Sequence, residues 1–277
     1  MDYYEKLIER CKNAGKTETI GKTVAGRDIL LFRKGTGAKT LVVGSTHARE
    51  HITTELIFGL FEDTEYPFDV VPCLNVDGVL LAKYGVSSTP DSMRRFLLGI
   101  NGGSTDFSLW KANLNAVDIN VNFDALWGSG KQNLRYPSSE NYIGKYPESE
   151  PETAAAAELI RKNDYSQVVS YHSKGELVYW GFYKNYLHYD EALSFAESIG
   201  YRLNTAANSA GGLKDYYDVV SNGLGLTVEV GEDRFSHPYP EKELPKLIKK
   251  HKRSLKILYE NGEKIAERLY ERSSRGG

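Results

Sequence analysis

The sequence predicts an α/β fold, in which a mixed, mostly parallel central sheet carries helices on both faces. Short apolar runs alternate with segments of helical periodicity, the pattern of sheets built from strand–helix units. The chain has 277 residues, of which 40% are hydrophobic, so it can bury a sizeable core. With no repeat and no low-complexity linker in residues 1–277, we expect one domain.

The first third of the chain contains the expected elements in alternating order. Residues 2–13 have an amphipathic helical pattern, and the turn at Ala25-Gly26 joins two predicted strands at 18–20 and 28–33. Residues 40–44 form a short, β-rich apolar run that indicates a buried strand. Residues 52–61 have helical spacing, and residues 68–74 are another apolar run.

The remaining elements follow a long irregular segment. Residues 86–146 are rich in Gly, Asn, Ser and aromatics with little periodicity, which is typical of a binding surface. Pro151 and four alanines predict a helix over 152–162. We expect strands at 167–172 and 224–230, a helix at 190–199, and a segment at 176–180 that continues or pairs with the strand at 167–172. Residues 241–269 are mostly helical, with a break expected near Asn261-Gly262.

Composition excludes several classes of partner. The net charge of −2 gives no support for a nucleic-acid or anionic membrane surface as partner. No window approaches 18 consecutive apolar residues, so we expect no transmembrane helix.

The charged N-terminal pattern lacks the apolar stretch of a signal peptide, and Cys11 and Cys73 form no disulfide framework. A cytoplasmic location is the simplest expectation, although a leader removed from the sequence would look the same.

The stretch GSTHAREH, residues 44–51, places ionisable groups where a buried strand ends. His47 and Glu50 are three residues apart and offer the nitrogen and oxygen ligands that zinc accepts. His172 is the natural third ligand, because it ends another apolar strand and ligands gather at the carboxyl ends of strands in open α/β sheets. His51 remains an alternative to His47. His51 and Glu55 have helical spacing, but Glu55 fits better on a solvated helix face.

A zinc site that hydrolyses amides also needs a proton acceptor. Glu229, in LGLTVEVG, is a carboxylate inside an apolar strand, where burial is costly without a purpose. It can take a proton from water and pass it to a leaving amine. A structural ion pair with an arginine or lysine is the competing interpretation.

Six motifs occur in the order THAREH, PCLNVDGV, WKANLNAVDINVNF, SEPET, SYHSKGE and LTVEVG. Together they resemble the zinc metallocarboxypeptidases of the M14, carboxypeptidase A-like family, from about Ile20 to Phe235. The resemblance implies that family's fold, a single zinc peptidase catalytic domain and Zn²⁺ as cofactor. It implies that zinc is bound by His47, Glu50 and His172, with Glu229 as general base and acid.

The resemblance also implies that cations stabilise the oxyanion. Arg49, inside the HARE motif, would polarise the substrate carbonyl or bind substrate carboxylates. Lys111 follows Trp110, where many members of the family carry an arginine. Its ammonium offers a point charge in place of a bidentate fork.

The departures from the family pattern concern the substrate. The family's N-R-N-F reads Asn120-Val121-Asn122-Phe123, so the arginine that grips a peptide's C-terminal carboxylate is missing, whereas Asn120 remains. Lys214 falls at the position that resembles the base of the family's pocket for the residue after the scissile bond. The further residues expected to bind substrate are Asp215 and Ser173. Ala207 stands nearest to the family's mobile tyrosine, for which the possible substitutes are Tyr201, Tyr216 and Tyr217.

These departures resemble the bacterial γ-D-glutamyl-L-diamino acid peptidases. Those enzymes cut the bond between D-glutamate and meso-diaminopimelate or lysine in peptidoglycan stem peptides. Lys214 would meet the carboxylate of the diaminopimelate side chain, and Asp215 or another acid would meet its ammonium. Two alternatives stay open: a metallocarboxypeptidase acting on ordinary peptides, and a non-catalytic zinc-binding or peptide-binding homologue.

Overall fold

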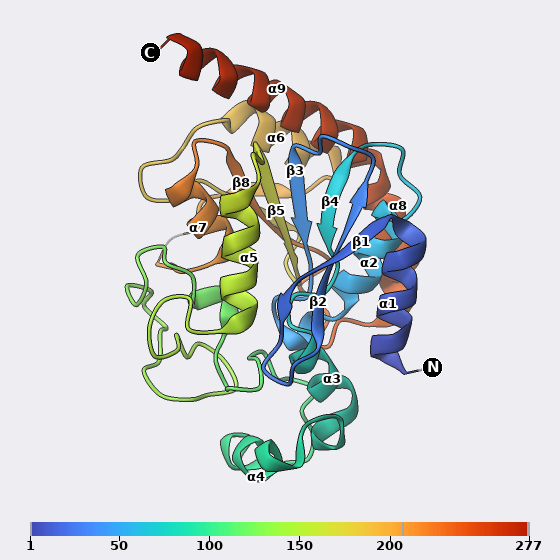
Figure 1. Ribbon diagram of the computed structural model, residues 1–277, viewed down its shortest axis with the longest axis vertical. Helices are drawn as coiled ribbons and strands as arrows, with labels where there is room; N and C mark the ends of the chain where they lie inside the picture. Colours follow the sequence, from blue (N-terminus) through green and yellow to red (C-terminus); the bar gives the residue numbers. More distant parts are fainter. Residues whose placement is uncertain (1, 207, 276–277) are drawn as a thin grey trace.

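The computed structural model describes residues 2–206 and 208–275. In this part of the chain one eight-stranded sheet runs in the order β1-β2-β4-β3-β5-β8-β6-β7 (Figure 1). The strands are β1 (Lys16–Lys22), β2 (Asp28–Lys34), β3 (Thr40–Val43), β4 (Phe68–Val71), β5 (Gln167–His172), β6 (Leu177–Trp180), β7 (Arg202–Asn204) and β8 (Leu224–Glu229). Strands β4, β3, β5 and β8 are parallel, whereas β1, β2 and β6 each have an antiparallel neighbour. The predicted fold class is confirmed.

The helices of the described residues surround this sheet, except α4, which lies apart from it at the bottom of the view (Figure 1). They are α1 (Tyr3–Ala14), α2 (Ile52–Phe61), α3 (Val76–Tyr84), α4 (Asp91–Ile100), α5 (Pro151–Lys162), α6 (Tyr189–Ser198), α7 (Leu213–Val220), α8 (Leu244–His251) and α9 (Leu255–Arg275). Asp2 caps α1 in a capping box with Glu5, and Pro151 opens α5, so local signals set both starts. No described helix has both the length and the apolar character of a membrane span.

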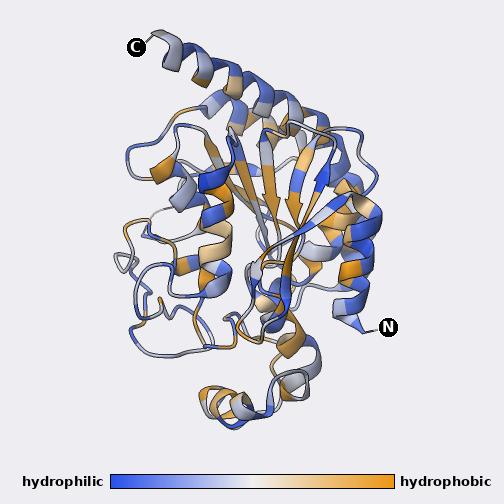
Figure 2. Ribbon diagram, in the orientation of Figure 1, coloured by the Kyte–Doolittle hydropathy of each residue, from blue (hydrophilic) through white to orange (hydrophobic). Residues whose placement is uncertain are grey.

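The two faces of the sheet bury separate hydrophobic cores. Alternate strand residues point to opposite faces, so Phe32 and Val42 join one core, and Leu31 and Val43 join the other. The first core contains side chains of α1, α2, α6, α8 and α9, and the second contains those of α5 and α7. Figure 2 shows the hydrophobic colouring concentrated on the central strands. Covered on both faces, the sheet leaves the ends of its strands for polar groups.

Two expectations about the elements were wrong. The C-terminal helical segment breaks at Lys252–Ser254, a 3-10 turn between α8 and α9, and α9 runs straight through Asn261 and Gly262. Gly262 is needed for close packing, because an added Cβ would lie 2.6 Å from Thr40 Oγ1. Strand β6 pairs with β8 and β7, not with β5.

The segment 86–146 also contains regular structure that its composition did not indicate. It includes α4 and a short 3-10 helix at Ile119–Val121, and irregular backbone makes up most of the rest. Buried asparagine side chains satisfy part of that backbone: Asn122 Nδ2 donates to Ile143 O at 2.8 Å, and Asn113 Oδ1 accepts from Asn115 N at 3.0 Å. The segment is therefore ordered by side chains in place of a hydrogen-bonded ladder.

Candidate metal centre and substrate pocket

Three predicted site residues meet at the carboxyl ends of two parallel strands. His47 follows β3, Glu50 ends the 3-10 helix Ala48–Glu50, and His172 is the last residue of β5. Strands β3 and β5 are parallel neighbours, so these ends lie at the same edge of the sheet. All three side chains are buried.

Side-chain hydrogen bonds hold the turn that carries His47 and Glu50. Ser45 N donates to Thr53 Oγ1 at 2.8 Å, and Thr53 Oγ1 donates to the carbonyl of Glu50 at 2.9 Å. Asn75 Nδ2 donates to the carbonyl of Thr46 at 3.2 Å. The polar residues after β3 thus replace the backbone partners that the chain loses where the strand ends.

The atoms of these residues have the spacing of a zinc ligand set. His47 Nδ1 lies 2.9 Å from Glu50 Oε1, His172 Nδ1 lies 3.0 Å from Glu50 Oε2, and the two Nδ1 atoms are 3.1 Å apart. Ligand atoms about 2.0–2.1 Å from zinc in a tetrahedral site are separated by roughly 3.3 Å. Small outward shifts of the three side chains would therefore admit the ion, and the donor set of two imidazoles and a carboxylate suits zinc.

His51, the alternative to His47, points elsewhere. Its Nδ1 lies 3.4 Å from Lys83 Nζ, and burial is the main cause that lowers its pKa to about 4. Glu55 forms an ion pair with Arg10 at 2.7 Å. Neither residue belongs to the group of three that could hold a metal.

The outer nitrogen of each imidazole has a partner that the sequence analysis missed. His47 Nε2 lies at an ion-pair distance of 3.2 Å from Asp118 Oδ1, without hydrogen-bond geometry, and His172 Nε2 lies in a hydrogen bond 3.0 Å from Ser170 Oγ. Such contacts fix the ring orientation and leave Nδ1 free for a metal. The signal in the sequence was Asp118 itself, an acid between the apolar residues Val117 and Ile119.

Asp118 also holds Lys111. The ammonium lies 2.8 Å from Asp118 Oδ2, and the carboxylate is fully buried. Burial alone would raise the pKa of Asp118, but Lys111 and His47 hold it well below its usual range. Burial alone would lower the pKa of Lys111, and Asp118 reverses that effect and raises it. Both groups are therefore charged, and one carboxylate connects the cation with an imidazole of the metal cluster.

Arg49 lies at the margin of the same cluster. Its Nη1 lies 3.3 Å from Glu140 Oε2 and 3.3 Å from the carbonyl of Leu109. The side chain is mostly buried, with 22% of its surface exposed. Ser173, the residue after His172, donates its backbone N–H to Glu50 Oε2 at 3.2 Å, and its buried hydroxyl has no partner among the described residues.

Glu229 ends β8 directly beside His172, its register partner on β5. Burial raises the pKa of its carboxyl group to about 7, with His172 opposing and Glu50 adding to the effect. Among the described residues it forms no ion pair, so the structural ion pair is not observed. A carboxyl group that titrates near neutral pH can both accept and donate a proton.

Beyond Glu229 opens a polar cavity of about 410 Å³. Its lining includes three expected substrate-binding residues, Asn120, Lys214 and Asp215, together with Tyr179 and Thr227. The structure thus brings the metal cluster, Glu229 and this pocket to one side of the sheet.

The ammonium of Lys214 is fully engaged inside the protein. It lies 2.8 Å from Asp215 Oδ1 and 3.3 Å from Asp218 Oδ2, and it donates to the carbonyl of Gly181 at 3.1 Å. An ammonium has three N–H groups, so a contact with a substrate carboxylate would break one of these bonds. Burial raises the pKa of Asp218 to about 7 despite the nearby ammonium. The base of the pocket is therefore not a free positive charge.

The three tyrosines considered as substitutes for the mobile tyrosine have other partners. The Tyr201 hydroxyl accepts from Gly231 N, that of Tyr216 accepts from Arg161, and that of Tyr217 donates to the carbonyl of Tyr165. Ala207 lies outside the described residues.

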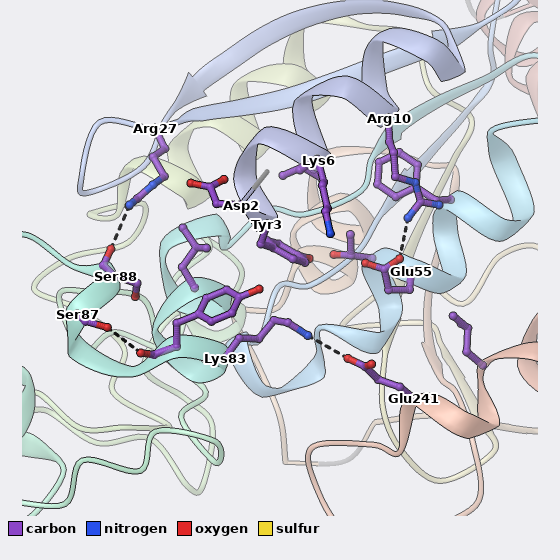
Figure 3. A pocket seen from close by; sticks show the side chains of 16 residues that line it. Asp2, Tyr3, Lys6, Arg10, Arg27, Glu55, Lys83, Ser87, Ser88 and Glu241 are labelled. Atoms are coloured by element: carbon purple, nitrogen blue, oxygen red, sulfur yellow. Dashed lines mark hydrogen bonds and ion pairs between the residues drawn. The ribbon is translucent and has the colours of Figure 1, made fainter.

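A larger cavity, of about 760 Å³, lies between α1, α2 and α3 (Figure 3). None of its lining residues belongs to the metal cluster, and Glu229 does not line it. Its carboxylates are engaged within the protein: Glu55 pairs with Arg10, Glu241 pairs with Lys83, and Asp2 caps α1. The metal cluster and its polar pocket therefore form the candidate site.

Comparisons with known proteins agree with this geometry. A family profile described as zinc carboxypeptidase, Peptidase_M14, matches residues 1–273. The chain is 31% identical over 250 residues to gamma-D-glutamyl-L-diamino acid endopeptidase 1 of Lysinibacillus sphaericus, covering 81% of this chain and 62% of that protein. It is 30% identical over 198 residues to mast cell carboxypeptidase A of Homo sapiens, covering 64% and 43% of the two chains.

Solved structures share the fold at low sequence identity. Bovine thrombin-activatable fibrinolysis inhibitor, solved with tick carboxypeptidase inhibitor, matches with a TM-score of 0.74 at 18% identity over 96% of this chain and 95% of that one. Murein-tripeptide amidase MpaA from Escherichia coli O157 matches with a TM-score of 0.58 at 20% identity over 92% and 95%.

Proposed function

Because the chain belongs to the zinc carboxypeptidase family M14, we propose that it is a zinc-dependent peptidase acting on peptidoglycan stem peptides. The bond cut is the amide between the γ-carboxyl of D-glutamate and a diamino acid, meso-diaminopimelate or lysine. Residues 1–277 act in this proposal as one catalytic domain. The observation that carries it is the meeting of a zinc ligand set with Glu229 at the mouth of a polar pocket.

His47, Glu50 and His172 would hold the zinc ion in this proposal. Zinc, when bound, supplies Lewis acidity toward water and the substrate carbonyl. Glu229 accepts a proton on its carboxylate from the attacking water and delivers it to the nitrogen of the leaving amine. Its pKa of about 7, which burial sets, suits both transfers at neutral pH.

Lys111 and Arg49 stabilise the charge that develops on the carbonyl oxygen. Asp118 keeps the ammonium of Lys111 in position before substrate arrives, which lowers the cost of reorganisation in the reaction. Arg49 has only long contacts, at 3.3 Å, and can exchange one of them for a substrate oxygen.

Three observations support a diamino acid on the leaving side. Val121 offers no charge for the C-terminal carboxylate of an ordinary peptide. Asp215 lines the pocket beside Lys214, whose ammonium is already paired, so the base offers a carboxylate to an ammonium and no free cation to a carboxylate. The relative from Lysinibacillus sphaericus is named for cleavage of such bonds.

The roles within the pocket follow from these contacts. Asp215 accepts the substrate ammonium, and Lys214 holds Asp215 in place in preference to binding a substrate carboxylate itself. Asn120, whose Oδ1 accepts from Leu213 N at 3.2 Å, presents its amide nitrogen to the substrate backbone. Ser173 offers its unpaired hydroxyl near the metal cluster.

A peptide panel tests the proposal. The zinc-loaded protein is incubated with L-Ala-γ-D-Glu-meso-diaminopimelate and with ordinary peptides, with and without a chelator, and products are identified by mass spectrometry. We expect release of diaminopimelate that stops with the chelator and with Glu229→Gln, which should keep its zinc. Release of C-terminal residues from ordinary peptides alone would support a carboxypeptidase. Cleavage of none of the substrates would support a non-catalytic homologue.

A further inference from the structure

Strand register places side chains of β8, β6 and β7 in successive rows on the face of the sheet that carries Glu229. Leu177 of β6 pairs with Glu229 of β8 and with Arg202 of β7, so these three side chains share one face. Tyr179 pairs with Thr227 and Asn204 in the next row of that face. The residues between them, Val178 and Val228, are buried on the opposite face.

This row ends on the edge strand with a free cation. Arg202 is exposed, and its guanidinium has no hydrogen bond or ion pair with any residue that the structure describes. Two strand spacings of about 4.8 Å separate β7 from β8, so the backbone of Arg202 lies roughly 10 Å from that of Glu229. Arg202 does not line the pocket itself, whereas Asn204 of the same strand does.

Tyr179 lies on the same face as Glu229 and Arg202, in the next row along β6. It lines the pocket, and its hydroxyl makes no hydrogen bond within the described ranges. Burial and the Glu229 carboxylate raise the pKa of this hydroxyl, whereas the Arg202 guanidinium lowers it, as expected for a group near both. Tyr179 and Arg202 thus both lie on the face along which a ligand held at Glu229 would extend.

The other cations near the site are already paired. Lys111 is held by Asp118 at 2.8 Å, Lys174 by Asp233 at 2.6 Å, and Lys214 by its two aspartates. A substrate carboxylate on the leaving side would have to break one of these contacts, draw Arg49 from Glu140 and from its proposed role at the carbonyl oxygen, or use Arg202. Guanidinium groups bind carboxylates through two parallel hydrogen bonds.

We infer that Arg202, assisted by the Tyr179 hydroxyl, binds the carboxylate at the far end of the leaving residue's side chain and so selects diaminopimelate over lysine. This inference rests on the proposed function. The two leaving residues differ in that carboxylate, because both carry the ammonium that Asp215 accepts. Arg202 is thus a specificity-determining residue for the distal carboxylate, a role distinct from that of the arginine missing at Val121.

The test compares three tripeptides, L-Ala-γ-D-Glu followed by meso-diaminopimelate, by diaminopimelate with an amidated distal carboxylate, or by L-lysine. The wild-type protein should cleave the first with a kcat/KM about 10- to 100-fold above the other two, the range of a charged hydrogen bond. Arg202→Gln should remove that preference, mainly through KM, and leave cleavage of the other two peptides within about 3-fold. Tyr179→Phe should cause a smaller loss, and Arg202→Lys should retain part of the preference.

A matched control is Arg95→Gln, since Arg95 is another exposed arginine, on α4 away from the pocket. It should change none of the three rates, and thermal unfolding should show both variants folded. An equal loss on all three peptides in Arg202→Gln would assign Arg202 to the α-carboxylate and overturn the distal assignment. If Arg202→Gln cleaves every peptide as fast as the wild-type protein does, Arg202 does not belong to the site. If the wild-type protein cleaves none of the three peptides, the proposed function is refuted, and this inference with it.

Discussion

Replacing Asp118 by asparagine should weaken zinc binding without touching a proposed ligand. Asp118 Oδ1 lies 3.2 Å from His47 Nε2, and its other oxygen lies 2.8 Å from Lys111 Nζ. Loss of such an outer partner lowers metal affinity by about 10- to 100-fold, or about 1.4–2.7 kcal/mol. The metal-free variant should also lose about 3 kcal/mol of unfolding free energy, because a buried ammonium loses its counter-charge.

Competition with a chromophoric chelator measures the zinc affinity, and urea unfolding of the metal-free protein measures the stability. The matched control is Lys111→Met, which also breaks the buried pair but leaves Asp118 beside His47. It should lose stability and turnover without a loss of zinc affinity. Equal zinc affinities in the wild-type protein and Asp118→Asn would refute the orienting role of Asp118.

Two further predictions concern buried charges. Lys214→Met leaves Asp215 and Asp218 without their ammonium, so urea unfolding should show a loss of about 3–5 kcal/mol; an unchanged midpoint would mean that this cluster does not stabilise the fold. Burial raises the pKa of Glu152 to about 7 from an ordinary value of 4.5, so the folded state holds a proton that the unfolded chain releases between these values. Its contribution to stability is therefore present below pH 4.5 and falls by about 3 kcal/mol as pH rises to 7. The stability of the wild-type protein relative to Glu152→Gln should fall by that amount between pH 4.5 and 8, and parallel stability curves would contradict the buried proton.

The metal cluster could be predicted because each ligand follows a short apolar strand. His47 comes shortly after the end of β3, and His172 is the last residue of β5. Both lie in motifs that resemble those of the family. Parallel pairing then brings these ends together at one edge of the sheet. Glu229 was predictable for the same reason, as an acid at the end of the apolar strand β8.

The pocket was harder to predict because its chemistry depends on tertiary contacts. The sequence shows Lys214 as a cation, but the contacts with Asp215, Asp218 and Gly181 that occupy its ammonium come from α7 and the loop after β6. Tyr179 and Arg202 gain their importance only from the register of β6 and β7. A three-residue edge strand such as β7 leaves almost no periodicity to detect.

Helix ends were predictable where local chemistry decides them. Asp2 and Pro151 signal the starts of α1 and α5 through capping and a preset φ. Gly262 was misread as a break because glycine usually weakens a helix, whereas here it lets α9 pack closely on Thr40. Its role depends on a neighbour more than 200 residues away in sequence.

The account depends on zinc binding between His47, Glu50 and His172, beside Glu229. Anomalous diffraction at the zinc absorption edge from crystals of the zinc-loaded protein tests this most directly. We predict one strong peak within bonding distance of both Nδ1 atoms and a Glu50 oxygen, about 2.0–2.2 Å from each. A zinc peak elsewhere in the molecule, with no density among these three residues, would contradict the account.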